Sequence, residues 1–372
     1  MPLDFRSALY LGLRHAHADL RSWTRLTTGA PAALIAPPDA RRVEGGLARL
    51  QGTESAVLAP STLHVFLDLF HLLAKEDVII MLDSGAYPVA RWGIECAQLR
   101  GVPVRRFQHF DAESLEFGLR AGRRRASIIV SDGLCPECGS RAPLQAYLNV
   151  ARRYGGALVV DDTQALGIYG RGVDRRRPWG SGGGGSLRAG QISGPDVILV
   201  SSLAKGFGAP VAALSGPRAL VRAFAANSRT REHSSPPSSA VVHAASRALH
   251  FNAHKGDSTR ARLLLNVRCF RSALARVDVP VLGRLFPVQT LADVRGPGAI
   301  ALHDRLQTRG IRTVLRRGPR GSTRLSFVLR ADHTPGDLSR TTEALVQELR
   351  QEPRLRTHLH RPAGECHHVE DP

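Results

Sequence analysis

Lys205 is the first residue whose surroundings indicate chemistry. It lies in the segment 201–208, SSLAKGFG, and only three of the 51 Lys and Arg residues in this 372-residue chain are lysines. The apolar run Val197–Val200 directly before it is typical of a buried parallel strand, and α/β proteins bind ligands beyond the carboxyl ends of such strands. Lys205 is therefore a candidate nucleophilic amine, although an ordinary lysine between a strand and a loop would look the same.

Asp161 ends a second apolar run, Ala157–Val160. A carboxylate at the end of a buried strand is costly to desolvate unless it is paired. A protonated pyridine nitrogen would pair with it, whereas the alternative is an aspartate that caps the next turn. Pyridoxal 5'-phosphate (PLP) needs an amine for its Schiff base, an anion at its ring nitrogen, donors for its phosphate and a flat partner for its ring. The sequence thus predicts a PLP site with Lys205 and Asp161 as its catalytic residues.

Six motifs, in order along the chain, are similar to those of one enzyme family. They are the segment 4–13, the segment 52–62, Asp132-Gly133 with Ala142-Pro143-Leu144, the segment 161–172, the segment 202–208, and His233-Ser234-Ser235-Pro236-Pro237. With them the chain resembles the α-oxoamine synthase branch of fold-type-I PLP enzymes, within aminotransferase class I/II. That branch includes 8-amino-7-oxononanoate synthase, 2-amino-3-ketobutyrate ligase and serine palmitoyltransferase. The resemblance runs from Asp4 to about Leu349 and implies an aspartate-aminotransferase-like fold.

The resemblance implies further cofactor-binding residues, which are Ser61, Thr62, Asp132, Ser202, Ser234 and Ser235. The first two match a stretch that holds the phosphate at a helix start, and Ser202 offers the phosphate a hydroxyl. Asp132 belongs to the acidic-Gly motif. The last two match a segment that reaches the phosphate of the neighbouring subunit, which implies a homodimer.

Two positions depart from the family pattern at the cofactor. Tyr87 stands where the family stacks a histidine on the ring, and Gln164 stands where the family has a second histidine near the phenolic oxygen. Tyrosine supplies the same flat contact, and glutamine donates a hydrogen bond, but neither titrates near neutrality as imidazole does. Both are expected to contact PLP.

The arginine that binds the substrate carboxylate in the family is also displaced. By spacing from His333-Thr334 its place falls on Ser326. Arg324 lies two residues earlier, on the same face of a strand, and is the candidate for this role, with Arg330 as another possibility. Both would otherwise be surface arginines of an arginine-rich chain.

The elements that position these residues form an α/β pattern. Apolar runs typical of buried parallel strands alternate with amphipathic helices, and the runs are Val78–Leu82, Ser127–Val130, Ala157–Val160 and Val197–Val200. We expect a large PLP-binding domain with a mainly parallel sheet over residues 41–245, after an N-terminal arm over 1–40. A smaller α+β domain is predicted over 246–352, and a flexible tail over 353–372.

Two segments are interpreted more plainly. The Gly-rich stretch 180–194 is predicted to be a flexible surface loop. Cys135-Pro136-Glu137-Cys138 is similar to half of a zinc knuckle, and the tail offers Cys366-His367-His368. Structural zinc needs four convergent ligands, so no metal is expected. Two reduced thiols are favoured over a redox disulfide.

The overall composition excludes several classes. The net charge of +19 comes from arginines spread along the chain, without an aromatic ladder or a basic arm, so nucleic-acid binding is not expected. No run approaches the ~20 apolar residues of a membrane span, and the N-terminus lacks a signal-peptide pattern. A cytoplasmic protein is predicted.

The resemblance implies condensation of an amino-acid-derived carbanion with an acyl thioester, carried by coenzyme A or an acyl carrier protein. The exchanges at Tyr87 and Gln164 leave open an aminotransferase or a specialised C–C bond-forming or replacement enzyme. A catalytically silent partner subunit is the alternative of another class, which the presence of both Lys205 and Asp161 disfavours.

Overall fold

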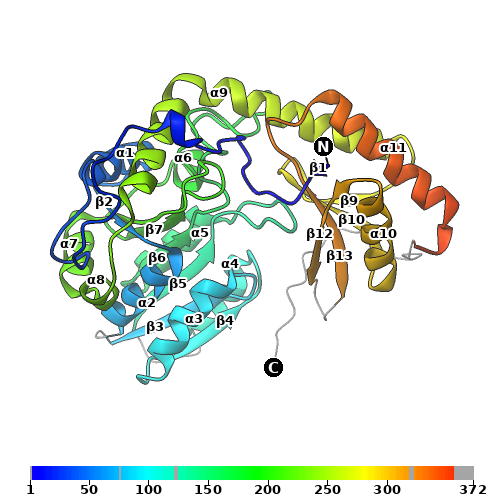
Figure 1. Cartoon of the computed structure of the whole chain (residues 1–372). Helices are drawn as coiled ribbons and strands as arrows, with labels where there is room; N and C mark the ends of the chain where they lie inside the picture. Colours follow the sequence, from blue (N-terminus) through cyan, green and yellow to red (C-terminus); the bar gives the residue numbers. More distant parts are fainter. Residues whose placement is uncertain (1, 75–76, 121–124, 318–321, 356–372) are drawn as a thin grey trace. The chain divides into compact units, whose positions relative to one another are not determined.

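The computed structural model describes residues 2–74, 77–120, 125–317 and 322–355 (Figure 1). The chain divides into two compact units. The large unit comprises Leu13–Leu134 and Arg141–Asp257, and the small unit comprises Met1–Gly12, Cys135–Ser140 and Ser258–Pro372. The Cys366-His367-His368 group and most of the predicted tail lie outside the described residues.

A seven-stranded sheet of order β2-β8-β7-β6-β5-β3-β4 forms the centre of the large unit. Strands β3 to β7 run parallel to one another, whereas β8 runs antiparallel to both β7 and β2. The strands are β2 Ser55–Ala59, β3 Val78–Asp83, β4 Val104–Phe107, β5 Ala126–Asp132, β6 Ala157–Asp161, β7 Val197–Ser202 and β8 Ala212–Gly216. The four predicted runs are β3, β5, β6 and β7, and the predicted mainly parallel α/β fold is confirmed.

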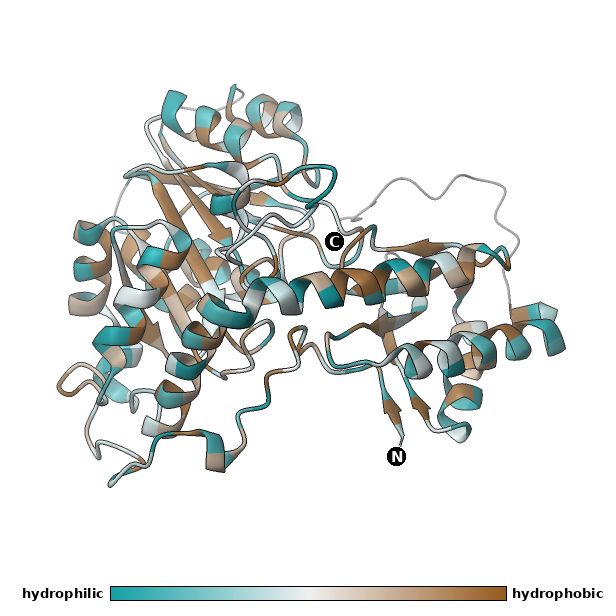
Figure 2. Cartoon of the chain, turned by 90° about the horizontal axis from the view of Figure 1, so that it is seen from above, coloured by the Kyte–Doolittle hydropathy of each residue, from teal (hydrophilic) through white to brown (hydrophobic). Residues whose placement is uncertain are grey.

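Side chains alternate across this sheet and build one apolar core on each face. Ile80 and Leu82 of β3 belong to one core, and Ile79 and Met81 belong to the other. Helices α2 (Thr62–Leu73), α3 (Pro88–Gln98) and α7 (Arg218–Asn227) contribute to the first core, and α4 (Ala112–Arg120), α5 (Leu144–Arg153) and α6 (Ser186–Gly190) contribute to the second. Figure 2 shows the sheet strands in brown between helices that carry teal residues.

The remaining elements of the large unit are η1 (His17–Asp19), α1 (Ala40–Gln51), α8 (Arg229–His233) and the first part of α9 (Ser239–Ala275). The predicted boundary at 245/246 falls inside α9, and the two units divide at Asp257 and Ser258 instead. A helix that continues through a domain boundary gives no break in its apolar pattern.

The small unit combines two sheets with helices. A four-stranded antiparallel sheet has the order β12 (Val314–Arg317), β13 (Thr323–Val328), β10 (Val288–Arg295) and β9 (Val281–Leu282), and β1 (Leu3–Asp4) pairs in parallel with β11 (Ile311–Arg312). Its other elements are the end of α9, α10 (Pro297–Thr308), α11 (Pro335–Gln351) and η3 (Pro353–Leu355). Thr334 and Asp337 form a capping box that starts α11.

The Gly-rich segment is not the flexible surface loop that the sequence predicts. Residues 183–187 are buried, and helix α6 begins at Ser186. The carboxylate of Asp162 accepts a hydrogen bond from the Ser186 N–H at 3.0 Å. A Cβ at Gly185 would lie 1.8 Å from Oδ2 of Asp162, so glycine here allows the chain to approach a buried carboxylate rather than to move.

Within the described residues, no helix combines the length and the apolar character that crossing a membrane requires.

Candidate active site

Four polar residues end four neighbouring parallel strands of the large unit. Asp83 is the last residue of β3, Asp132 of β5, Asp161 of β6 and Ser202 of β7. Asp132 and Asp161 are direct Cα partners across β5 and β6. Because the carboxyl ends of parallel strands meet at one edge of a sheet, these side chains gather where α/β proteins bind ligands.

Lys205 lies in the turn between β7 and β8. The N–H of Leu203 donates to the carbonyl of Val211 at 2.8 Å and fixes the base of this turn. A Cβ at Gly206 would lie 2.6 Å from the carbonyl oxygen of Leu166. Glycine is therefore required directly after the lysine, because the turn packs against the segment that follows β6.

Tyr87 places an aromatic ring beside this lysine. The Nζ atom of Lys205 lies 5.5 Å from the centroid of the Tyr87 ring. Tyr87 is the N-cap residue of α3, and Pro88 follows it at the first helical position. The Tyr87 N–H donates to Oδ1 of Asp132 at 3.1 Å. Tyr87 is 47% exposed, so its ring retains surface for a planar cofactor.

Asp161 is 6% exposed, and the Thr163 N–H donates to its Oδ1 at 2.9 Å. Burial raises the pKa of the Asp161 carboxyl, while the hydrogen bonds from Thr163 and the charge of Lys205 oppose this shift. A cation at this edge of the sheet favours the ionised carboxylate. A pyridinium N–H has the charge and the donor that this group needs.

Asp132 adds a second buried carboxyl to the same edge. Burial, and then the negative charge of Asp161, raise the pKa of Asp132 well above its usual range. Two neighbouring buried carboxyls are costly to ionise together unless a cation compensates them. The residues present therefore fit PLP: an amine, a flat ring and a carboxylate pair suited to a protonated heterocycle.

Comparison with known proteins identifies the family. Residues 20–345 match the family model for aminotransferase class I and II. The chain belongs to the aminotransferase class I and II family.

Relatives within this family share most of the chain. An 8-amino-7-oxononanoate synthase of Halorhodospira halophila is 30% identical over 92% of this chain and 85% of its own length. A second one, of Alkalilimnicola ehrlichii, is 28% identical over 84% of this chain and 78% of its own length. The expected membership of the α-oxoamine synthase branch is confirmed, and so are the assignment as a transferase and PLP as its cofactor.

Solved structures show the same fold. A serine palmitoyltransferase from S. paucimobilis with bound PLP is 19% identical, with a TM-score of 0.82 over 94% of this chain and 87% of that one. An 8-amino-7-oxononanoate synthase from Francisella tularensis is 22% identical, with a TM-score of 0.74 over 95% of this chain and 99% of that one. The predicted fold-type-I architecture is therefore confirmed.

In this α-oxoamine synthase-type chain, Asp83 serves the structure rather than the cofactor. Its carboxylate hydrogen-bonds Nδ1 of His109 at 2.7 Å, the hydroxyl of Ser131 at 2.9 Å and the N–H of Gly85 at 2.8 Å. Both Asp83 and the His109 side chain are buried. This network ties the loop after β4 to the ends of β3 and β5.

The predicted phosphate site lies at the start of α2. Ser61 is the N-cap residue of this helix, but its hydroxyl makes no capping hydrogen bond with the helix amides. It instead hydrogen-bonds Nδ1 of His64 at 2.8 Å. Helix amides and their dipole favour an anion at this end. His64, one turn into the helix, was not identified from the sequence, although a Ser-x-x-His spacing at a helix start places the two side chains together.

Ser202, Thr163 and Gln164 lie next to the candidate catalytic residues Lys205 and Asp161 in the sequence. The Ser202 N–H donates to the hydroxyl of Thr163 at 3.0 Å, which joins the ends of β6 and β7. Gln164 is buried in the turn directly after Asp161. Thr163 was missed by sequence reasoning, because a hydroxyl that links two strand ends has no motif of its own.

The segment predicted to reach a neighbouring subunit follows α8. The Ser234 hydroxyl donates to the carbonyl of Thr230 in α8, and Ser235 is exposed. The predicted role of both serines concerns the PLP of a second subunit, so it stays a prediction.

Arg324 lies in β13 of the small unit. Its side chain is 13% exposed, and a guanidinium nitrogen lies 3.5 Å from a carboxylate oxygen of Glu137. It is therefore not a solvated surface arginine. Ser326, where the family arginine would fall, hydrogen-bonds the Thr290 hydroxyl at 2.7 Å. The carboxylate that contacts Arg324 belongs to Glu137 of the same unit, so a role of Arg324 in binding a substrate carboxylate stays a prediction.

The Arg330 side chain makes hydrogen bonds within the small unit. Its Nε donates to Asp332 at 2.8 Å, and a second nitrogen donates to the carbonyl of Asp4 at 2.7 Å. Arg330 is 5% exposed. It holds the N-terminal strand in the small unit, and Arg324 remains the candidate for the substrate carboxylate.

Proposed function

We propose that this chain joins the α-carbon of an amino acid to the acyl group of a thioester with PLP as cofactor. The observation that carries the proposal is the position of Lys205. Its Nζ atom lies 5.5 Å from the centroid of the Tyr87 ring, at the edge of the sheet where β5 and β6 end in the buried Asp132 and Asp161. The 8-amino-7-oxononanoate synthases among the relatives support this reaction class. When bound, PLP supplies an electron-withdrawing ring that stabilises negative charge on the substrate α-carbon.

Residues of the chain would bind the cofactor and transfer the proton. Lys205 would hold the cofactor through its amine, and the same amine would move the proton at the substrate α-carbon. Asp161 would pair with the protonated ring nitrogen as a carboxylate, Tyr87 would stack on the ring, and Ser61 with the α2 amides would bind the phosphate.

Proton transfer falls to Lys205 because Tyr87 and Gln164 occupy the two positions at which the family resemblance places histidines. Neither side chain is an imidazole, the group that commonly serves as a general acid or base near neutrality. These exchanges favour amino-group transfer as the second candidate function. A silent subunit would have no need of Lys205 and Asp161 together.

The partners are part of the same proposal. We propose a homodimer in which Ser234 and Ser235 reach the phosphate of the other subunit. The acyl donor is a thioester of coenzyme A or of an acyl carrier protein, and a cytoplasmic location stays a prediction.

Product analysis separates the two candidate functions. The holoenzyme is incubated with a panel of amino acids, with and without acyl-coenzyme A and acyl-carrier-protein thioesters. Our proposal predicts release of the free thiol and a product that contains both carbon skeletons. Transfer of the amino group to an oxo acid, with no thioester consumed, would favour the second candidate.

A further inference from the structure

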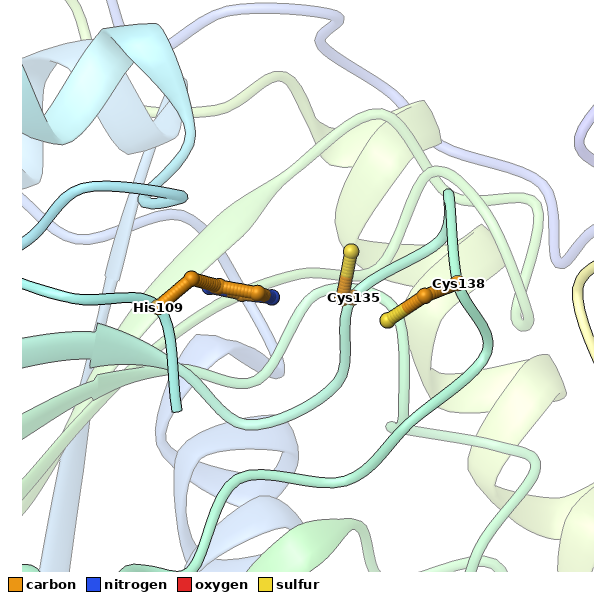
Figure 3. A group of neighbouring side chains, drawn as sticks. All are labelled: His109, Cys135 and Cys138. Atoms are coloured by element: carbon orange, nitrogen blue, oxygen red, sulfur yellow. The ribbon is translucent and has the colours of Figure 1, made fainter. Parts of the chain in front are cut away.

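Two cysteines share one tight turn of the small unit. Cys135 and Cys138 enclose Pro136 and Glu137, and Figure 3 shows both side chains on this turn; His109, also drawn, belongs to the large unit. The Sγ atoms of the two cysteines lie within 4.8 Å of each other. Cys135 is buried and Cys138 is half-buried, so a reagent reaches the second sulfur first.

The backbone holds this turn in place. The Gly139 N–H donates to the Cys135 carbonyl at 2.9 Å, and the Cys135 N–H donates to the Ser140 carbonyl at 3.0 Å. Gly139 has a φ of +71°, and a Cβ there would lie 2.0 Å from the carbonyl oxygen of Gly283. Because the turn is already closed, a bond between the two sulfurs would cost little additional chain entropy.

An ion pair fixes the middle of the turn. Glu137 lies between the two cysteines, and its carboxylate contacts Arg324 of β13 at 3.5 Å. The Glu137 and Arg324 side chains are 15% and 13% exposed. The Glu137–Arg324 ion pair anchors the centre of the turn, and the close backbone packing at Gly139 anchors its end. To form a disulfide, the two cysteines therefore need to change only their side-chain torsions.

We propose that Cys135 and Cys138 form a reversible dithiol–disulfide pair that reacts with low-molecular-weight disulfides. The Cys138 thiolate attacks one sulfur of the small disulfide, whose S–S bond breaks and releases one thiolate. The Cys135 thiolate then attacks the Cys138 sulfur and displaces the second small thiolate. In total, two protein thiols are oxidised to one protein disulfide, and one small disulfide is reduced to two thiols.

The test uses the holoenzyme of the triple variant Cys96→Ser/Cys269→Ser/Cys366→Ser, which leaves the pair as the sole cysteines. It is treated with excess oxidised glutathione, and its intact mass is measured. We expect a loss of two hydrogen atoms with no retained glutathione, and full recovery after dithiothreitol. Adding Cys135→Ser should trap glutathione on Cys138, and adding Cys138→Ser should give much slower labelling of Cys135.

Three outcomes would overturn the proposal. The first is a triple variant that keeps both thiols, and the second is one that accumulates a glutathione adduct without closing the protein disulfide. The third is one equivalent of bound zinc that protects the thiols until a chelator removes it. Circular dichroism of each variant confirms that it is folded before it is treated.

Discussion

The Nζ atom of Lys205 lies 5.5 Å from the centre of the Tyr87 ring, while the Tyr87 backbone N–H donates to Asp132 at 3.1 Å. The lysine comes from the turn after β7, the tyrosine from the loop after β3, and the aspartate from the end of β5. One residue of each of three separate strand ends thus contributes to a single arrangement.

Replacing Tyr87 tests the flat contact. Tyr87→Ala removes the ring, and stacked aromatic contacts contribute about 0.5–1.5 kcal/mol beyond simple burial. We expect PLP to bind at least about 2- to 10-fold more weakly, as measured by titration of the apoenzyme. Tyr87→Phe keeps the ring and should bind PLP as the native chain does. Equal affinity of all three proteins would contradict the stacking role.

Replacing Arg324 tests the carboxylate site. Hydrogen bonds to charged groups contribute about 1.5–3 kcal/mol, so Arg324→Ala should raise KM for the amino-acid substrate by about 10- to 100-fold. Arg295 is the cross-strand partner of Arg324, and Arg295→Ala is the matched control, with KM unchanged. An unchanged KM in the Arg324 variant would remove this residue from substrate binding.

Two glycines with similar backbones test the packing of the Gly-rich segment. Gly185 and Gly182 have φ values of +88° and +86°, but only a Cβ at Gly185 meets another group, Oδ2 of Asp162 at 1.8 Å. Gly185→Ala should therefore lower the free energy of unfolding by more than Gly182→Ala, by about 1–3 kcal/mol. Urea unfolding measures both. Equal losses of unfolding free energy in the two variants would show that the segment accommodates a Cβ at Gly185 without a packing penalty.

Asp162 gives a pH dependence of stability. Burial raises the pKa of the Asp162 carboxyl from its ordinary value of 3.8 to about 7. The folded state therefore binds more protons than the unfolded state between these values, and this contribution to the free energy of unfolding is lost as pH rises through that range. The expected slope is on the order of 1 kcal/mol per pH unit.

Comparing Asp162→Asn with the native chain isolates this contribution, because other buried carboxyls titrate in both proteins. We expect the difference in unfolding free energy between the two to change steadily from about pH 4 to pH 7. A constant difference across that range would contradict a raised pKa at Asp162.

The ends of two predicted strands explain why Lys205 and Asp161 could be proposed as catalytic residues from the sequence. Asp161 and Lys205 each follow a wholly apolar run, and parallel strands bring their carboxyl ends to one edge. The antiparallel strand β8 was not predicted, since Ala212–Gly216 is a short run of small residues without a clear period. The local pattern therefore identified the parallel strands whose ends carry the candidate site, but it did not describe the complete sheet.

Contacts between distant segments were beyond sequence reasoning. The composition of the glycine run 182–185 indicates mobility. In the structure, however, the Ser186 N–H directly after this run donates a hydrogen bond to the buried carboxylate of Asp162. The turn at Cys135–Ser140 belongs to the small unit although its neighbours in sequence belong to the large one. Only the fold reveals that Glu137 in this turn pairs with Arg324.

The most direct test of the account is the position of the covalent cofactor bond. Purified holoenzyme is reduced with borohydride, digested and analysed by mass spectrometry, with Lys205→Ala and the exposed-lysine variant Lys255→Ala treated in parallel. We predict a pyridoxyl adduct on Lys205 in the native chain and in the Lys255 variant, and neither adduct nor yellow absorbance in the Lys205 variant. An adduct on another residue, or colour that survives in the Lys205 variant, would contradict the account.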